Sequence, residues 1–210
     1  MLFRSTNMST ITESDMMRDM WMSGGYGLMH RFMSTERYQE QMKQFVDKCM
    51  SLDMFTPIFG AISIGVKGEE INNGWLDNEH ISVVIIDIAH GDSDSVCKTI
   101  ADVKSKWPHL DVIAGNIATS SGFRRMVDAG ADAVRVGIGG GSACTTRMVT
   151  GHGMPTLTSI IDCAEASRQT GVPIIADGGF KTSGDIVKAL AFGASAVCLG
   201  SMLAATSKIG

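Results

Sequence analysis

Short apolar segments alternate with amphipathic helical segments along almost the whole chain, and this alternation restricts the fold more than any other feature. The stronger apolar segments are rich in Val, Ile and Ala, and most end in Gly or Asp, as buried parallel strands that lead into loops do. The predicted strands are residues 2–7, 25–31, 58–66, 82–88, 111–115, 133–137, 172–177 and 195–200, of which the first two are weaker. The predicted helices are residues 13–22, 35–52, 94–107, 120–129, 156–170 and 183–192. This alternation predicts an α/β protein with a (β/α)8 TIM barrel rather than an open sheet.

The barrel is predicted to be a single domain over residues 1–210, because no Pro-rich or low-complexity linker interrupts the pattern. Residues 67–80 are only weakly helical and receive no assignment. The last predicted strand ends ten residues before the end of the sequence, which is too few for a full eighth helix. We therefore expect a barrel that is incomplete at its eighth helix, either unfinished or closed by something outside this chain.

Capping residues predict where several helices begin and end. Thr119 or Ser120 before one helix, and Ser183 before the last, are typical N-cap residues. Glycine follows three of the predicted helices, as it commonly does after a helix C-terminus. These glycines are Gly130, Gly171 and Gly193.

Charge and cysteine content exclude several classes of protein. The formal net charge is −4 without any block of like charge, which argues against nucleic-acid and membrane-surface partners. The five cysteines are odd in number and include no Cys-x-x-Cys pair, so neither a zinc site nor a disulfide framework is expected. Residues 1–5 do not begin a signal peptide, and no apolar run approaches the ~20 residues of a membrane span. We expect a cytoplasmic protein with reduced thiols.

One loop carries the strongest indication of chemistry. Residues 137–147 read Gly-Ile-Gly-Gly-Gly-Ser-Ala-Cys-Thr-Thr-Arg and follow a predicted strand. Glycines at this density bring backbone groups close to a ligand. Cys144, beside Arg147 and two threonine hydroxyls, is a candidate nucleophile, whereas the other four cysteines lie in helix or strand patterns and are interpreted as buried hydrophobes. The backbone carbonyl groups of Gly139, Gly141 and Cys144 are also able to bind a monovalent cation. The periodicity of the sequence does not test this interpretation.

Small residues follow the sixth, seventh and eighth predicted strands, at the end where barrel enzymes commonly bind phosphate. They are Ser142 after the sixth strand, Gly178 and Gly179 after the seventh, and Gly200 and Ser201 after the eighth. Asp177 ends the seventh strand and, when ionised, only accepts hydrogen bonds, which suits a ribose diol. One Gly-Gly pair alone is better interpreted as a turn, but three such loops on neighbouring strands favour a phosphate site.

Polar residues also follow the fourth and fifth predicted strands. Asp87 ends a wholly apolar strand and needs a partner, which is either a nucleoside hydroxyl or the beginning of the next helix. Asn116 has the same placement, and it either contacts an amide or shapes a turn.

Five segments are recognisable as a set. They read Ile-Ile-Asp-Ile-Ala-His-Gly-Asp-Ser (85–93), Ala-Gly-Asn (114–116), Ala-Asp-Ala-Val-Arg-Val-Gly-Ile-Gly (131–139), Gly-Ser-Ala-Cys-Thr-Thr-Arg (141–147) and Ile-Ala-Asp-Gly-Gly (175–179). In this order they resemble the IMP dehydrogenase / GMP reductase family, and the likeness runs from about residue 7 to residue 206. The combination of the cysteine loop with the Asp-Gly-Gly strand end is highly specific.

The resemblance implies a (β/α)8 barrel, usually a homotetramer, that acts on a purine 5′-monophosphate (GMP or IMP) with NADP(H) or NAD. It implies that Cys144 forms a covalent adduct with purine C2 and that the Thr146 hydroxyl lies next to the reacting centre. The implied substrate-binding residues are Met8, Ser142, Asp177, Gly178, Gly179, Gly200 and Ser201. The implied cofactor-binding residues are Asp87, Ser93, Asn116 and Gly137, and the implied potassium ligands are the carbonyl groups of Gly139, Gly141 and Cys144.

The motifs divide between the two activities of the family. A short connection at residues 53–57 stands where dehydrogenases usually carry a regulatory CBS pair, so no CBS insertion is expected. Met-His-Arg-Phe (29–32) and Ile-Ser-Ile-Gly-Val-Lys (62–67) resemble a bacterial GMP reductase branch. Ser-Gly-Asp-Ile-Val-Lys-Ala-Leu (183–190) and Arg135 resemble dehydrogenases instead. The balance favours NADPH-dependent reductive deamination of GMP to IMP.

Two alternatives stay open. The first is IMP dehydrogenase, which oxidises IMP to XMP with NAD. The second is a truncated, non-catalytic relative that binds nucleotide or assembles with longer subunits, because the sequence ends before the mobile flap that follows the eighth strand in the family. We accordingly expect slow or no turnover from this chain alone. A flavin-binding barrel is a third class, which the cysteine loop disfavours.

Overall fold

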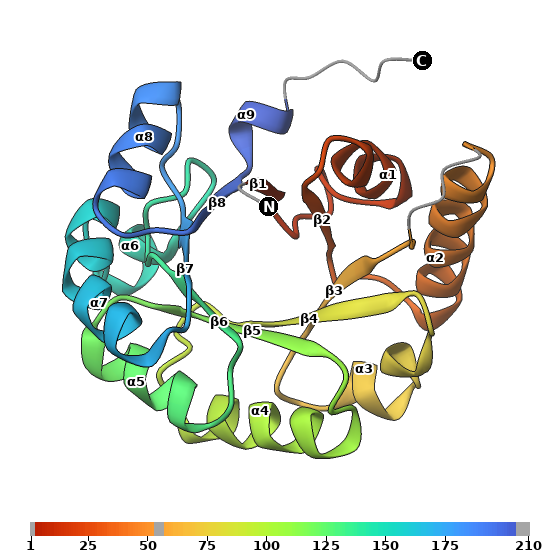
Figure 1. Ribbon diagram of the computed structural model, residues 1–210, viewed down its shortest axis with the longest axis horizontal. Coiled ribbons are helices and arrows are strands. Elements are labelled where there is room, and N and C mark those ends of the chain that lie inside the picture. The colour runs from red at the N-terminus through yellow and green to blue at the C-terminus, as the bar shows by residue number, and fades with distance from the viewer. Residues whose placement is uncertain (1–2, 53–56, 205–210) are drawn as a thin grey trace.

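Eight parallel strands form a closed barrel in the computed structural model, which describes residues 3–52 and 57–204. The strands are β1 (Phe3–Ser5), β2 (Tyr26–Met29), β3 (Gly60–Ile64), β4 (Ile81–Asp87), β5 (Asp111–Ile117), β6 (Ala133–Val136), β7 (Ile174–Asp177) and β8 (Ala196–Leu199). Each strand pairs with its neighbours in sequence order, and the helices lie around the outside (Figure 1). The predicted (β/α)8 TIM barrel is confirmed.

Closure of the sheet corrects one expectation. Phe3, Arg4 and Ser5 of β1 pair in parallel with Val197, Cys198 and Leu199 of β8, so the sheet is closed within this chain and not by something outside it. Backbone pairing between the first and last strands is sufficient for closure, whatever covers the outer surface there. The described helix that follows β8 is the short α9 (Ser201–Ala204), and residues 205–210 lie outside the described part.

All six predicted helices are present, with bounds shifted by at most two residues. They are α1 (Ser14–Met22), α2 (Thr35–Met50), α4 (Asp94–Lys106), α5 (Ser120–Asp128), α7 (Thr156–Thr170) and α8 (Ser183–Ala191). The unassigned residues 67–80 contain α3 (Glu69–Asn72) and the 3-10 helix η1 (Trp75–Asp77). A further short helix, α6 (Thr146–Thr150), follows the glycine-rich loop.

Side chains of the strands alternate between two hydrophobic clusters. Val83 and Ile85 of β4 belong to the cluster inside the barrel, and Val84 and Ile86 belong to the cluster under the helices. The inner cluster comprises Leu28, Ala61, Val83, Ile85, Ile113, Ala133, Ile175, Ala196 and Cys198. Because side chains fill the interior, ligand chemistry in this fold is confined to the rim formed by the carboxyl ends of the strands.

The N-terminus of α8 corrects a second prediction. Thr182, rather than Ser183, is the N-cap: its hydroxyl accepts from the Asp185 N–H at 3.3 Å, and the Asp185 carboxylate accepts from the Thr182 N–H at 3.0 Å. This reciprocal pair is a capping box, which satisfies backbone donors that the helix leaves free. The choice of Thr119 or Ser120 for α5 resolves to Thr119, whose hydroxyl accepts from Gly122 N–H at 3.2 Å.

We expect Thr182→Ala to lower the free energy of unfolding by about 1 kcal/mol, because the Asp185 N–H loses its side-chain acceptor and keeps only the Thr182 carbonyl, 3.1 Å away. Ser183→Ala removes a hydroxyl from the neighbouring position without touching the cap, and is expected to change stability by less than about 0.5 kcal/mol. Urea denaturation followed by circular dichroism compares the two variants. Equal losses in both would show that the cap is not what stabilises this end of α8.

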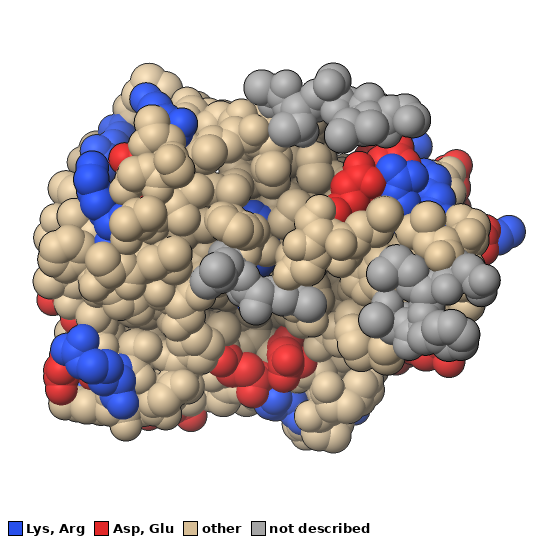
Figure 2. Space-filling view, turned by 45° about the horizontal axis from the view of Figure 1, so that its top comes forward, with Lys and Arg blue, Asp and Glu red and all other residues tan. Residues whose placement is uncertain are grey.

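Charged side chains are dispersed over the face of the molecule shown in Figure 2. On the face shown in Figure 2, Lys and Arg form separate groups, several of them beside Asp or Glu. Of the helices in residues 3–52 and 57–204, none combines the length and the apolar character that crossing a membrane requires.

Candidate active site

The glycine-rich loop lies between β6 and α6, at the carboxyl-end rim of the barrel. Cys144 is half-buried there, and its thiol donates to Thr146 Oγ1 across 3.2 Å. The Cys144 N–H donates to the Gly141 carbonyl at 3.1 Å, which folds the loop into a turn around the cysteine. Arg147 does not pair with the thiol: its guanidinium donates to the Met154 carbonyl at 3.0 Å. The loop thus presents Cys144 at the rim, with one hydroxyl beside its sulfur.

The loops after β6, β7 and β8 come together next to Cys144. The hydroxyls of Ser142 and Ser201 lie 3.5 Å apart, which joins the β6 loop to the beginning of α9. Gly178 and Gly179 have φ values of +93° and +88°, and a Cβ on Gly178 would lie 2.9 Å from the Gly141 nitrogen. The β6 and β7 loops therefore approach each other closely only because glycine occupies this position. Five of the residues predicted to bind the substrate lie on this part of the rim: Ser142, Asp177, Gly178, Gly179 and Ser201.

Two carboxylates predicted to bind different ligands share one cation. Arg135 of β6 is 5% exposed, and its Nη1 lies 3.0 Å from Asp87 Oδ1 while its Nη2 lies 3.0 Å from Asp177 Oδ2. Asn116 donates from Nδ2 to Asp177 Oδ2 at 2.7 Å and to the Gly137 carbonyl at 2.8 Å. Burial acts to lower the pKa of Arg135, but the carboxylates of Asp177 and Asp87 outweigh it and the pKa is raised. The guanidinium is therefore a permanent charge of this cluster.

This cluster adds a partner to Asp87 that the sequence did not indicate. Asp87 Oδ1 lies 3.0 Å from Arg135 Nη1, and the contact of Asp87 with a nucleoside hydroxyl stays a prediction. Asn116 makes its hydrogen bonds to Asp177 and to the Gly137 carbonyl, so it connects β5 to β6 and β7.

Three predicted site residues have local partners only. The Met8 carbonyl, after β1, accepts from Ile11 N–H at 2.9 Å, and the Met8 side chain is 37% exposed. Ser93 Oγ lies 3.0 Å from Ser95 Oγ at the beginning of α4. The carbonyl of Gly200, the residue before α9, accepts from Ala204 N–H at 3.0 Å. In the described part of the chain, no hydrogen bond joins these three residues to the Cys144 loop.

Two polar residues of the rim were missed as site residues. Asn7, 4% exposed, accepts from Arg135 Nη1 through Oδ1 at 2.9 Å. Thr156 Oγ1 donates to the Gly178 carbonyl at 3.1 Å. The sequence did contain an indication of Asn7. Arg135 is a cation within a predicted apolar strand, and such a cation requires buried hydrogen-bond acceptors. Among the described residues, no group of three or more His, Cys, Asp and Glu side chains is placed to hold a metal ion.

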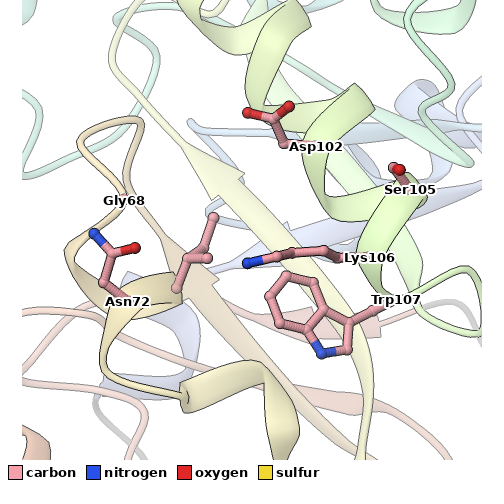
Figure 3. Close-up of a pocket in the computed structure, with 7 residues that line it drawn as sticks. Gly68, Asn72, Asp102, Ser105, Lys106 and Trp107 are labelled. Atoms are coloured by element: carbon pink, nitrogen blue, oxygen red, sulfur yellow. The ribbon is translucent and has the colours of Figure 1, made fainter.

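A shallow cavity of about 360 Å³ lies elsewhere, on the outer side of the barrel between α3 and α4. Figure 3 shows Lys106 extending over the Trp107 ring, 5.2 Å from its centroid, towards the helix that carries Asn72. The other lining residues are Gly68, Ile71, Asp102 and Ser105. None of the predicted site residues lines this cavity.

Burial separates Cys144 from three of the other thiols. Burial raises the pKa of Cys49 to about 11 and the pKa values of Cys163 and Cys198 to about 12. The prediction that these cysteines are buried is confirmed, whereas Cys97 is only half-buried.

We expect iodoacetamide at about pH 8 to modify Cys144 and Cys97, because a thiol with a pKa near 11 is thiolate in only about one molecule in a thousand at that pH. Mass spectrometry of tryptic peptides measures each site. A ligand bound against this loop, such as the purine mononucleotide that the resemblance implies, should slow the reaction at Cys144 and leave Cys97, on α4, unchanged. Faster reaction at Cys163 or Cys198 than at Cys144 would contradict the exposure described here.

The fold and this site together define a class of protein: a (β/α)8 barrel with a thiol on a glycine-rich loop and a carboxylate pair at the same rim. The family model described as "IMP dehydrogenase / GMP reductase domain" matches residues 1–209. The chain belongs to the IMP dehydrogenase / GMP reductase family.

Curated relatives agree with this assignment. The chain is 48% identical over 153 residues to an inosine-5′-monophosphate dehydrogenase of Nitrosopumilus maritimus, an alignment that covers 72% of this chain and 32% of the relative. It is 56% identical over 170 residues to the protein of the same name from Chlorobaculum tepidum, covering 80% of this chain and 34% of the relative. The Escherichia coli K12 protein of that name is 52% identical over 128 residues, which covers 61% and 26% respectively. The matched part of the chain thus corresponds to about a third or less of each relative.

Proposed function

We propose that the protein is a purine-nucleotide oxidoreductase that binds a purine 5′-monophosphate across the loops after β6, β7 and β8. The observation that supports it best is the approach of Ser142 to Ser201 at 3.5 Å beside a half-buried Cys144. Hydroxyls and backbone N–H groups gathered there suit a phosphate. Asp177, at the end of β7, is assigned to accept from ribose hydroxyls, an arrangement that would direct the base towards the thiol.

Oxidation of IMP to XMP with NAD is the reaction we propose first, because the relatives described above are named as IMP dehydrogenases. Reductive deamination of GMP to IMP with NADPH is the second candidate. It is favoured by the segments Met-His-Arg-Phe (29–32) and Ile-Ser-Ile-Gly-Val-Lys (62–67). A purine held at the same place by the same cysteine serves either reaction.

Cys144 is proposed to add through its sulfur to purine C2, which forms a C2–S bond and divides one difficult substitution into two steps. Thr146 Oγ1, which accepts from the thiol, orients the sulfur and is the first group in reach of its proton. A nicotinamide cofactor, when bound, would supply the acceptor for the hydride from C2. Water then attacks C2, the C2–S bond breaks, XMP is released and Cys144 regains a proton.

The residues on the cofactor side fit a ribose. Asp87 keeps one carboxylate oxygen that Arg135 does not hold, and its side chain is 24% exposed. Asn116 Nδ2 is engaged by Gly137 and Asp177, so its side-chain oxygen is the group that it offers to a ligand. Ser93 adds a hydroxyl at the beginning of α4. These groups, with Gly137, would hold the cofactor.

The potassium ligands proposed from the resemblance are the carbonyl groups of Gly139, Gly141 and Cys144. Neutral carbonyl oxygens are the donor type that suits a monovalent cation, and the Gly141 carbonyl already accepts from Cys144 N–H. A cation bound there would fix the shape of the loop that carries the thiol. The proposed assembly is a homotetramer, which light scattering tests.

Binding and turnover are measured separately to test the proposal. Calorimetry with IMP and with GMP measures the mononucleotide site, and the absorbance of reduced nicotinamide follows IMP plus NAD and GMP plus NADPH. Turnover of one pair assigns the reaction. Binding without turnover of either pair indicates the non-catalytic, nucleotide-binding alternative. Absence of binding by both nucleotides would refute the proposed function.

A further inference from the structure

We propose that Arg135 is a positioning residue that couples the substrate side of the site to the cofactor side by holding Asp177 and Asp87 at once. The inference rests on the proposed function, because it takes Asp177 as the ribose ligand of the mononucleotide and Asp87 as a ligand of the cofactor. Arg135 itself touches neither ligand in this proposal.

The geometry of the guanidinium is that of a bridge. Nη1 lies 3.0 Å from Asp87 Oδ1 on β4, and Nη2 lies 3.0 Å from Asp177 Oδ2 on β7. Nη1 also donates to Asn7 Oδ1 after β1, at 2.9 Å. One planar group thus connects strands from different sides of the barrel, and its rigid fork fixes the distance between the two carboxylates.

The same contacts determine which carboxylate oxygens face a ligand. Asp177 Oδ2 receives both Arg135 Nη2 and Asn116 Nδ2, so Oδ1 is the oxygen left for hydroxyls of a ribose. Asp87 uses Oδ1 for Arg135, which leaves Oδ2. A rotation of the guanidinium towards one carboxylate would turn both acceptors away from these orientations.

The charge and burial of Asp87 and Asp177 explain why a cation is needed between them. The Arg135 side chain is 6% exposed and the carboxylates of Asp87 and Asp177 are 24% and 17% exposed, so solvent screens the cluster only partly. Two carboxylates and one guanidinium leave a net charge of −1. Without Arg135 the two carboxylates would face each other with no cation between them, which costs free energy and drives them apart.

The direct test is calorimetric titration of the chain with IMP, or with GMP if IMP does not bind. Arg135→Met is expected to weaken mononucleotide binding about tenfold or more, and Arg135→Lys, which restores the charge without the fork, to recover part of that loss. Circular dichroism establishes that each variant is folded. Unchanged affinity in a folded Arg135→Met would overturn the proposal.

A second variant tests the coupling between Asp87 and Asp177 while Arg135 stays in place. Asp87→Asn preserves shape and removes a negative charge. If only long-range electrostatics acted, the anionic mononucleotide would bind more tightly. If Arg135 transmits the change, the guanidinium loses one of its anchors, Asp177 is held less firmly and binding weakens, by about threefold to tenfold.

Asp92→Asn is the matched control, because it makes the same chemical change in the segment that follows β4. Asp92 pairs with Arg125, 2.7 Å away, and not with Arg135. We expect Asp92→Asn to leave mononucleotide affinity within about twofold of the parent. Equal effects of Asp87→Asn and Asp92→Asn would overturn the proposal.

A double-mutant cycle completes the test. The effect of Asp87→Asn should disappear in the Arg135→Met background, or in Arg135→Lys if the methionine variant does not fold. Persistence of the full effect would show that Asp87 acts without Arg135. A parent chain that binds no mononucleotide refutes the proposed function and this inference together, whereas a parent that binds with all variants unchanged refutes the inference alone.

Discussion

Replacement of Cys144 by alanine is expected to lower the rate of the proposed purine oxidation by at least about a thousandfold. The physical reason is that the sulfur is the group that forms a bond to C2, and neither Thr146 nor a water at the same place is a comparable nucleophile. Mononucleotide binding should change by less than about threefold, because the phosphate and the ribose are held by other residues. The absorbance of reduced nicotinamide gives the rate, and calorimetry gives the affinity.

Intact-mass measurement after mixing with IMP and NAD provides a second readout that does not require many turnovers. The parent should gain the mass of a nucleotide on Cys144, and Cys144→Ala should not. Cys97→Ala is the control, because this half-buried thiol lies on α4, outside the loop. Parent-like turnover by Cys144→Ala, or a nucleotide adduct that persists in it, would contradict the role of this residue.

Gly137→Ala is expected to have the largest effect on stability, a loss of at least about 4 kcal/mol in the free energy of unfolding. Gly137 has a φ of +141°, which L residues rarely adopt. An added Cβ would overlap the carbonyl oxygen of Asp177 on the neighbouring strand. Its N–H donates to the Ile117 carbonyl at 2.8 Å, so the backbone cannot move without breaking the contact with β5.

Gly171→Ala is the matched control for this prediction. Gly171 follows α7 with a φ of +75°, and a Cβ there would meet no heavy atom within 4 Å. It should therefore show the cost of the left-handed conformation alone, about 1–2 kcal/mol. Urea denaturation of both variants separates the conformational cost from the overlap. A Gly137→Ala variant as stable as Gly171→Ala would mean that the ends of β6 and β7 are able to separate.

The fold was predictable because its signals are local. Buried strands such as β4 and β5 were identified from continuous apolar segments, and Gly171 was identified as the residue that ends α7. Strand bounds were less accurate. β1 has 3 residues and β2 has 4, fewer than predicted for either, because the predicted ranges ran on into the polar residues 6–7 and 30–31, which lie in the loops after these strands.

Contacts between distant residues were not predictable in the same way. Arg135 meets Asp87 across 48 positions and Asn7 across 128, and nothing in the local pattern indicates either pairing. Ser142 and Ser201 are 59 positions apart, and their approach was predicted only because β6, β7 and β8 were expected to be neighbours. Thr182 was missed as the N-cap of α8 because Thr182 and Ser183 both have side chains suited to capping, and the backbone decides between them.

The pairing of β1 with β8 also determines when the barrel can form during synthesis. Phe3 has Val197 as its partner, so β1 keeps an open edge until β8 has left the ribosome. Contacts of such high sequence separation slow folding, and open strand edges in the nascent chain are able to pair with other molecules. Rapid dilution from denaturant should therefore yield more aggregate at high protein concentration than a helical bundle of similar size would.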